Sequence, residues 1–134
     1  MSQQNVDLVR QAFAVRDSDG VEAALRLFAS DVAWYTSEQW LEGAVYRGHE
    51  GLRTVEAMWT ANIDDWAWRV HDIREAGDRV VALSEMTGRT KRSGVPVSRR
   101  VGLVVSDIHD GLLGAVRVYS SWREALEAVG LEDG

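Results

Sequence analysis

The spacing of apolar residues predicts two short helices at the start of the chain. Val6, Val9 and Phe13 recur at helical spacing, which indicates a first helix from about residue 3 to 16. A second apolar stripe covers residues 21–28, and Asp19 followed by Glu22 has the pattern of a capping box. Both helices are too short to be stable alone, so we expect them to pack against the rest of the fold.

A strand, a loop and a third helix are predicted next. Residues 31–36 alternate between two sets of side chains, as a strand does. Residues 37–51 have no clean period and contain three glycines, which indicates a loop. Leu52, Val55 and Trp59 then mark a helix.

Almost all of the sequence from Trp66 to Ser120 has the pattern of strands. We expect one strand from Trp66, followed by strands at 79–90, 97–108 and 112–120, with a hairpin turn at Asp110 and Gly111. Ser121 caps a short C-terminal helix. A long antiparallel run curls and buries one face, and the helices that can fill its concave side precede it. The pattern therefore predicts an α+β fold with a sheet wrapped around helices and an apolar interior.

Composition narrows the class of protein. The 134 residues fit one domain, 1–134, and the absence of cysteine excludes disulfides and thiolate chemistry. A formal net charge of −6 argues against a nucleic-acid partner, and no apolar stretch is long enough for a membrane span. The N-terminus has no basic-then-apolar signal, so we expect a cytoplasmic protein. The three histidines share no metal-ligand spacing, and we expect no metal and no cofactor.

Tryptophan is the unusual residue type, with six in the chain. Tryptophan buries a large area but needs a partner for its N–H group, and it can fill a core or line a ligand cavity. The sequence leaves both roles open.

Four segments of the chain resemble the SnoaL-like branch of the nuclear transport factor 2-like superfamily, which includes ketosteroid isomerase. They are residues 27–34 (LFASDVAW), 46–52 (YRGHEGL), 76–81 (AGDRVV), and 109–111 (HDG) with the strand at 116–119. The resemblance spans nearly the whole chain. It implies a cone, in which a curved mixed sheet encloses three helices of the N-terminal half and a short C-terminal helix follows. It also implies a deep apolar pocket and a homodimer formed through the outer face of the sheet.

The catalytic residues of the superfamily are not reproduced at the matching positions. The base of ketosteroid isomerase matches Thr36, its tyrosine matches Phe13, and its late-strand acid matches Val104 or Val105. The aspartate of SnoaL-type cyclases matches Ser120. None of these side chains can do the required proton transfer.

The resemblance nevertheless implies which residues line the pocket. They are Phe13, Trp34, Thr36, Trp40, Tyr46, Trp59, Trp68, Val104, Tyr119 and Ser120. Tyr46 matches a residue at the pocket mouth, but it could equally pack the loop onto the third helix.

Glu85 and His71 are the candidates for acid–base catalysis, and an acid from the loop, Glu38 or Glu42, is the alternative source of the acid–base group. Glu85 interrupts an apolar strand, so it either points into the cone as a general base or faces outward to pair with Arg99 or Arg100. His71 lies opposite the face of Trp66 and Trp68, so it points outward if those tryptophans line the interior.

Two functions remain open at this point. The first is the binding of a small apolar or aromatic ligand, such as a polyketide, steroid or terpenoid, with isomerase, cyclase or hydrolase activity as its enzymatic form. The second is a non-catalytic dimeric scaffold or ligand-binding module whose cone is filled by its own aromatic side chains.

Overall fold

A computed structural model describes residues 2–36 and 44–131. Its helices are α1 (Ser2–Asp19), α2 (Val21–Ala24), α4 (Gly48–Asn62) and α5 (Trp122–Ala128), with a 3₁₀ turn η1 (Leu25–Leu27) after α2. Its strands are β1 (Phe28–Tyr35), β2 (Val45–Arg47), β3 (Ile63–Ala76), β4 (Arg79–Thr90), β5 (Pro96–Ser106) and β6 (Leu113–Tyr119).

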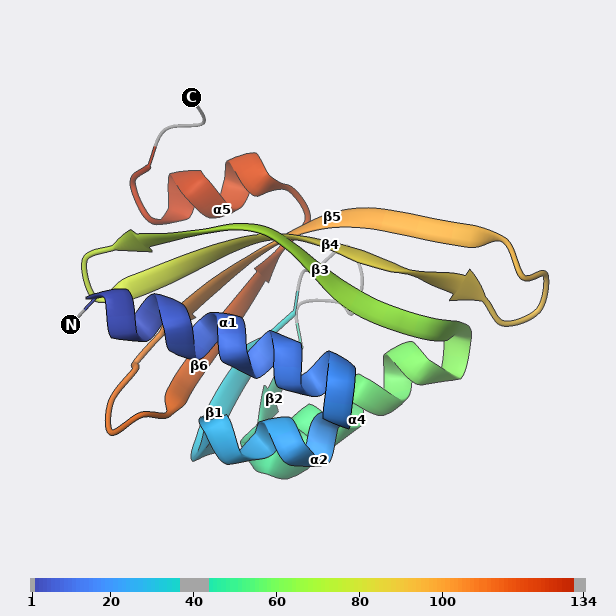
Figure 1. Cartoon of the computed structure of the whole chain (residues 1–134), viewed down its shortest axis with the longest axis horizontal. Coiled ribbons are helices and arrows are strands. Elements are labelled where there is room, and N and C mark those ends of the chain that lie inside the picture. The colour runs from blue at the N-terminus through green and yellow to red at the C-terminus, as the bar shows by residue number, and fades with distance from the viewer. Residues whose placement is uncertain (1, 37–43, 132–134) are drawn as a thin grey trace.

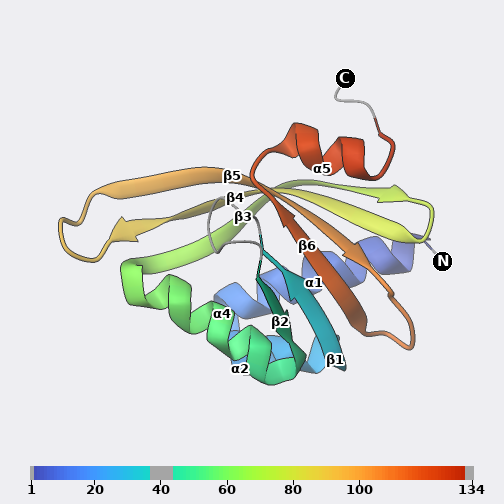
Figure 2. The same ribbon diagram turned by 180° about the vertical axis from the view of Figure 1, so that it is seen from behind.

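The six strands form one curved mixed sheet in the order β2-β1-β6-β5-β4-β3. The pairing of β1 with β6 is parallel, and the others are antiparallel. Helices α1, α2 and α4 lie on one side of the sheet and α5 lies on the other (Figures 1 and 2). The predicted α+β fold, with a curved mixed sheet around three helices and a short C-terminal helix, is confirmed.

The N-terminal helices differ from prediction where they meet. Helix α1 continues through Asp19, and Gly20 takes the N-cap position of α2 with a φ of 96° and no side-chain cap. The predicted capping box on Asp19 is therefore wrong, because that residue is still inside the preceding helix. Gly20 supplies a positive φ that a residue with a Cβ rarely adopts, and this allows the chain to turn sharply.

Strand β2 is the element that the sequence pattern did not reveal. It has three residues and pairs Tyr46 with Trp34 of β1. Helix α4 follows it directly at Gly48, four residues before the predicted start at Leu52. A strand this short leaves too few residues for an alternation to be recognised.

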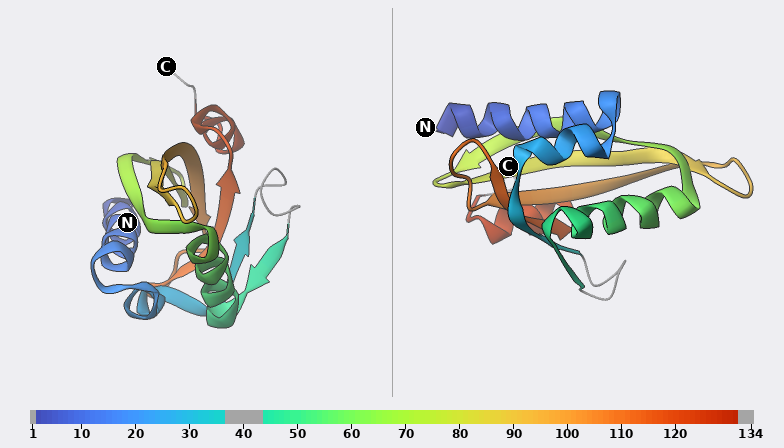
Figure 3. Two further views of the ribbon diagram at one scale, coloured as in Figure 1. Left: turned by 90° about the vertical axis from the view of Figure 1, so that its right-hand side faces the viewer. Right: turned by 90° about the horizontal axis from the view of Figure 1, so that it is seen from below.

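Each face of the sheet has its own apolar cluster. Along β4, Val80 and Ala82 join the inner cluster with the N-terminal helices, whereas Val81 and Leu83 join an outer cluster with α5. Figure 3 shows the corresponding layers, with helices on both sides of the sheet. Both faces of the middle strands are covered, which explains why their sequence is almost continuously apolar.

Strand β3 contains two register shifts that change which residues point inward. One lies between Asp64 and Ala67, and the other lies at His71, between Val70 and Asp72. After the second shift, Ile73 takes the inward position that strict alternation would assign to Asp72. Bulges of this kind invert the inside–outside pattern of the residues that follow.

The predicted turns and caps after β5 are confirmed. Asp110 and Gly111 have φ values of 54° and 72°, as a tight hairpin turn with two positive φ angles requires. The hydroxyl of Ser121 accepts a hydrogen bond of 3.1 Å from the backbone N–H of Glu124, so it caps α5.

Gly102→Ala should destabilise the domain, because α5 packs directly against β5 at Gly102. A Cβ on Gly102 would lie 2.4 Å from Cβ of Ala125 and 3.1 Å from the carbonyl oxygen of Ser121. We expect a loss of about 2 kcal/mol in the free energy of unfolding, measured by urea denaturation. Ala125→Gly in the same chain should restore space, so the two substitutions should couple by about 1 kcal/mol. Additive effects would contradict this packing.

Candidate functional site

A pocket lined almost entirely by apolar side chains lies between the N-terminal helices and the inner face of β1 and β3. Its free volume is about 50 Å³. Aliphatic side chains from α2 and α4 form part of the wall, including Val21 and Val55. Six aromatic side chains form most of the rest: Phe13, Phe28, Trp34, Trp59, Trp66 and Trp68.

The aromatic side chains form a continuous series from α1 to α4. The rings of Phe13 and Trp68 meet edge-on with centroids 5.8 Å apart, and Trp68 meets Trp66 in the same way at 5.7 Å. Trp59 lies 6.1 Å from Trp66. Edge-on contacts at these distances are the favourable arrangement of aromatic pairs, so the wall is firmly packed.

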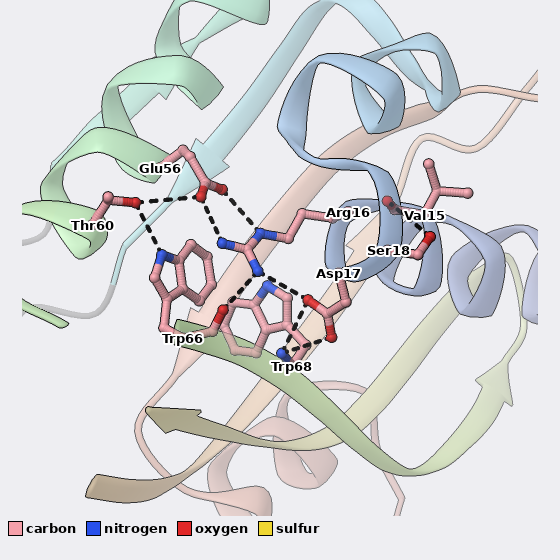
Figure 4. Close-up of polar contacts among 8 residues, drawn as sticks. All are labelled: Val15, Arg16, Asp17, Ser18, Glu56, Thr60, Trp66 and Trp68. Carbon is pink, nitrogen blue, oxygen red and sulfur yellow. Dashed lines mark hydrogen bonds and ion pairs between the residues drawn. The ribbon is translucent and has the colours of Figure 1, made fainter. Parts of the chain in front are cut away.

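The polar part of the wall is an ion pair between Arg16 of α1 and Glu56 of α4 (Figure 4). Nε of Arg16 donates to Oε1 of Glu56 at 3.1 Å, and Nη2 donates to Oε2 at 2.6 Å. The two side chains are only 15% and 21% exposed. A two-pronged pair of this kind fixes the orientation of both groups.

Arg16 also connects α1 to β3. Its Nη1 donates to the carbonyl oxygen of Trp66 at 2.8 Å and to Asp17 at 3.0 Å, and its guanidinium lies 3.4 Å from the centre of the Trp66 ring. Burial acts to lower the pKa of Arg16, but hydrogen bonds to Glu56 and Asp17 outweigh it and raise the pKa above its ordinary value. The guanidinium therefore stays charged in the pocket wall.

Neighbouring polar groups complete this arrangement. The indole N–H of Trp66 donates to the hydroxyl of Thr60 at 3.1 Å, and that hydroxyl lies 3.5 Å from Oε2 of Glu56. The carboxylate of Asp17 accepts from the backbone N–H of Trp68 at 3.0 Å. The ion pair and the indole N–H of Trp66 thus have partners within the protein, and the space that remains is apolar.

The structure places four of the expected pocket residues in this wall: Phe13, Trp34, Trp59 and Trp68. Tyr46 is half-buried and packs against the inner cluster. The hydroxyl of Thr36 donates to the carbonyl oxygen of Ala44 at 2.9 Å, beyond the end of β1. Trp40, Glu38 and Glu42 lie outside the described residues.

Three other expected pocket residues lie elsewhere, which is a correction to the sequence interpretation. Val104 and Tyr119 belong to the outer face and pack with α5. Val105, the neighbour of Val104, is the residue in the inner cluster. Ser120 donates to Glu124 at 3.0 Å at the start of α5. The late-strand acid of ketosteroid isomerase matches either Val104 or Val105 in the sequence. A shift of one residue moves a strand side chain to the opposite face of the sheet.

Glu85 and His71 also lie on the outer face, paired with each other. Nε2 of His71 is 3.0 Å from Oε1 of Glu85, and the hydroxyl of Ser98 donates to the same carboxylate. The His71 ring lies 5.4 Å from the ring of Trp122, the first residue of α5. Glu85 is therefore not directed into the apolar interior.

Arg16 and Glu56 are the polar pocket residues that the sequence interpretation missed. Arg16 follows Phe13 by three residues and Glu56 follows Leu52 by four, so both lie on the apolar stripe of their helix. Opposite charges on the inward stripes of two helices were a detectable signal. Among the described residues, no group of three or more His, Cys, Asp or Glu is placed to hold a metal ion. Nor does any described helix combine the length and apolarity that crossing a bilayer requires.

The chain matches the SnoaL-like domain family over residues 9–114. It belongs to this family. No curated protein matches the chain in sequence.

Solved structures share the fold of this SnoaL-like domain. A protein with a ketosteroid isomerase-like fold from Catenulispora acidiphila, crystallised with trimethylamine, is 21% identical with a TM-score of 0.73, and 92% of each chain is covered. TerC, crystallised with polyporic acid, is 19% identical with a TM-score of 0.77, covering 94% of this chain and 98% of its own. A proposed SnoaL-like polyketide cyclase from Jannaschia is 18% identical with a TM-score of 0.76, covering 96% and 92%. At these identities the comparison shows the fold alone.

Replacing Arg16 by methionine should destabilise this SnoaL-like domain strongly. The change leaves Glu56 without its guanidinium partner and removes the cation from the face of Trp66. We expect a loss of about 2–3 kcal/mol in the free energy of unfolding, measured by urea denaturation.

Arg53→Met is the matched control. Arg53 also joins α4 to an N-terminal helix, through Glu22, but the pair is exposed to solvent. Such pairs contribute little, so the control should change stability far less than Arg16→Met. Equal losses in the two variants would contradict the role assigned to Arg16.

Proposed function

We propose that this domain binds a small, mostly apolar molecule in the pocket between the N-terminal helices and the sheet. The observation that supports the proposal is the composition of the wall, with six aromatic side chains and one ion pair. Small-molecule sites are typically lined in this way, with a few polar groups that orient the ligand. The structures with trimethylamine and with polyporic acid add support, because they bind small molecules within the same fold.

The free volume of about 50 Å³ limits what can enter without rearrangement. Ligand pockets usually measure roughly 300–1,000 Å³, and a cavity of about 150 Å³ accepts benzene. A polyketide-, steroid- or terpenoid-sized ligand therefore requires a wall residue to move. Trp59 is the most suitable, because it is half-buried whereas Trp34, Trp66 and Trp68 are each 7–8% exposed.

An acid–base reaction in this pocket would depend on Glu56. Among the described residues, it is the carboxylate that lines the pocket, whereas Glu85 and His71 lie on the opposite face of the sheet. For a reaction of the isomerase, cyclase or hydrolase kind, a bound ligand would have to approach Glu56 and exchange contacts with Arg16. We therefore place any catalytic role on Glu56, with Arg16 as its charged neighbour.

The small free volume also favours a second function, a non-catalytic module whose interior is occupied by its own tryptophans. In this alternative, the outer face of the sheet would form the interface of a homodimer. Half-buried Tyr35, Tyr119 and Trp122 lie on that face, and Arg117 stacks on Tyr35 with 4.0 Å between the guanidinium and the ring centre. Light scattering at micromolar concentration should give the dimer mass, and a monomer mass would exclude this interface.

Val55→Phe tests ligand binding without leaving a hole. The larger side chain should occupy the free volume next to Leu52 and Trp59 while keeping the wall apolar. Isothermal titration calorimetry with 2-naphthol and with trimethylammonium chloride measures the effect. We expect at least one probe to bind the original protein and to bind Val55→Phe at least tenfold more weakly.

Trp122→Phe is the control for this test, because Trp122 packs on the outer face with α5. It should leave the affinity for the probe within a factor of two. Binding that is lost equally in both variants, or that is absent from the original protein and appears in Trp59→Ala, would instead support the module with a filled interior.

Trp34→Ala should either abolish binding or unfold the domain, because Trp34 lies in the wall and is 7% exposed. Full stability together with unchanged binding would contradict that placement.

A further inference from the structure

The hairpin formed by β4 and β5 carries a charge opposite to that of the chain as a whole. Residues 86–106 contain no aspartate or glutamate, although the formal net charge of the chain is −6. The same segment contains five basic residues: Arg89, Lys91, Arg92, Arg99 and Arg100. Two carboxylates lie close to these basic residues, since Glu85 of β4 is opposite Arg100 and Asp64 pairs with Lys91 at 2.8 Å. Basic residues still outnumber acidic ones on this hairpin, which indicates a surface that attracts an acidic partner.

The hairpin is well defined and reaches beyond the rest of the domain (Figures 1 and 3). Its strands stay paired as far as Arg89 and Pro96, and the backbone N–H of Thr90 donates to the carbonyl oxygen of Val95 at 2.9 Å. Val95 at the turn is 52% exposed. The basic side chains are therefore displayed on a fixed scaffold that a partner can reach.

Among the described residues, one edge of β5 carries no paired strand next to these side chains. Strand β6 pairs with β5 as far as Tyr119, opposite Gly102, and the chain then leaves the sheet to form α5. Within the described part of the chain, residues 96–101 pair with β4 on one side and with no strand on the other. An open strand edge presents N–H and C=O groups to which a further strand can bind.

We propose that residues 96–101 of β5 bind an extended acidic segment of a partner protein as an added strand. Successive side chains of a strand point to opposite faces, so Arg99 and Arg100 flank the open edge on both faces of the sheet. Acidic side chains at successive positions of an added strand could then pair with each of them. Two copies of this edge would bring like charges together, which disfavours pairing of the domain with itself through β5.

Arginine and proline at an open edge can also serve only to prevent aggregation. The two roles differ in a measurable way, because a purely protective edge binds no strand. The proposal concerns a surface outside the pocket and does not depend on the proposed ligand function.

The test uses a peptide with neighbouring glutamates, fluorescein-Thr-Val-Glu-Glu-Val-Thr-amide, and the full chain, because neighbouring glutamates of a strand lie on opposite faces. We expect micromolar affinity by fluorescence anisotropy in low salt, weakened at least tenfold by about 0.5 M salt because the charges lie at the surface. Hydrogen–deuterium exchange should slow at amides within residues 96–101. Matched peptides with lysine for glutamate, or with proline for valine, should bind at least tenfold more weakly.

Two variants with the same change of charge locate the site on the hairpin. Arg99→Glu, at the open edge, should weaken peptide binding at least tenfold. Arg92→Glu, in the turn, should weaken it less than threefold.

The proposal would be overturned if the peptide did not bind at millimolar concentration, or if the proline peptide bound with equal affinity. It would also be overturned if hydrogen exchange slowed only outside residues 96–101, or if Arg99→Glu and Arg92→Glu weakened binding equally. Binding of double-stranded DNA or phosphatidylserine vesicles through Arg99, in place of the peptide, would also overturn it. So would self-association that protects residues 96–101 in the absence of peptide.

Discussion

The burial of the concave face of the sheet is the constraint on which the rest of the structure depends. The six strands form one curved sheet, and its inner face is covered by α1 and α4 rather than by a second sheet. Tryptophans fill the wide space between these layers, and the Arg16–Glu56 pair joins the two helices across it. The pocket is what remains of that space, so its shape follows from the side chains that stabilise the fold.

Much of the fold could be predicted because the signals were long or chemically specific. The bounds of β4 and the turn at Asp110 and Gly111 could be read directly from a nearly continuous apolar run and from turn residues. Strand β2 could not, since three residues carry no period. The capping box predicted at Asp19 was wrong, because the pattern of Asp19 and Glu22 does not reveal that α1 continues through Asp19.

The candidate site was harder to predict because it depends on which face each strand residue occupies. Val104 was assigned to the pocket on a match that is ambiguous by one residue, and one residue is enough to move it to the outer face. The bulge at His71 has the same effect on the residues after it in β3. Trp68 was expected to line the pocket and Trp66 was not, although strict alternation places both on the inner face. Arg16 and Glu56 each interrupt the apolar stripe of a helix, which was a detectable signal, but their contact depends on how the two helices pack, which no local pattern specifies.

The central claim is that a small apolar molecule binds among the inner tryptophans. Fluorine NMR of protein labelled with 5-fluorotryptophan tests it most directly, because each tryptophan gives its own signal. On titration with 2-naphthol, the account predicts shifts for Trp59, Trp66 and Trp68, with the largest at Trp59, and no shift for Trp122 on the outer face. Shifts confined to Trp122, or no shift at any tryptophan, would contradict it.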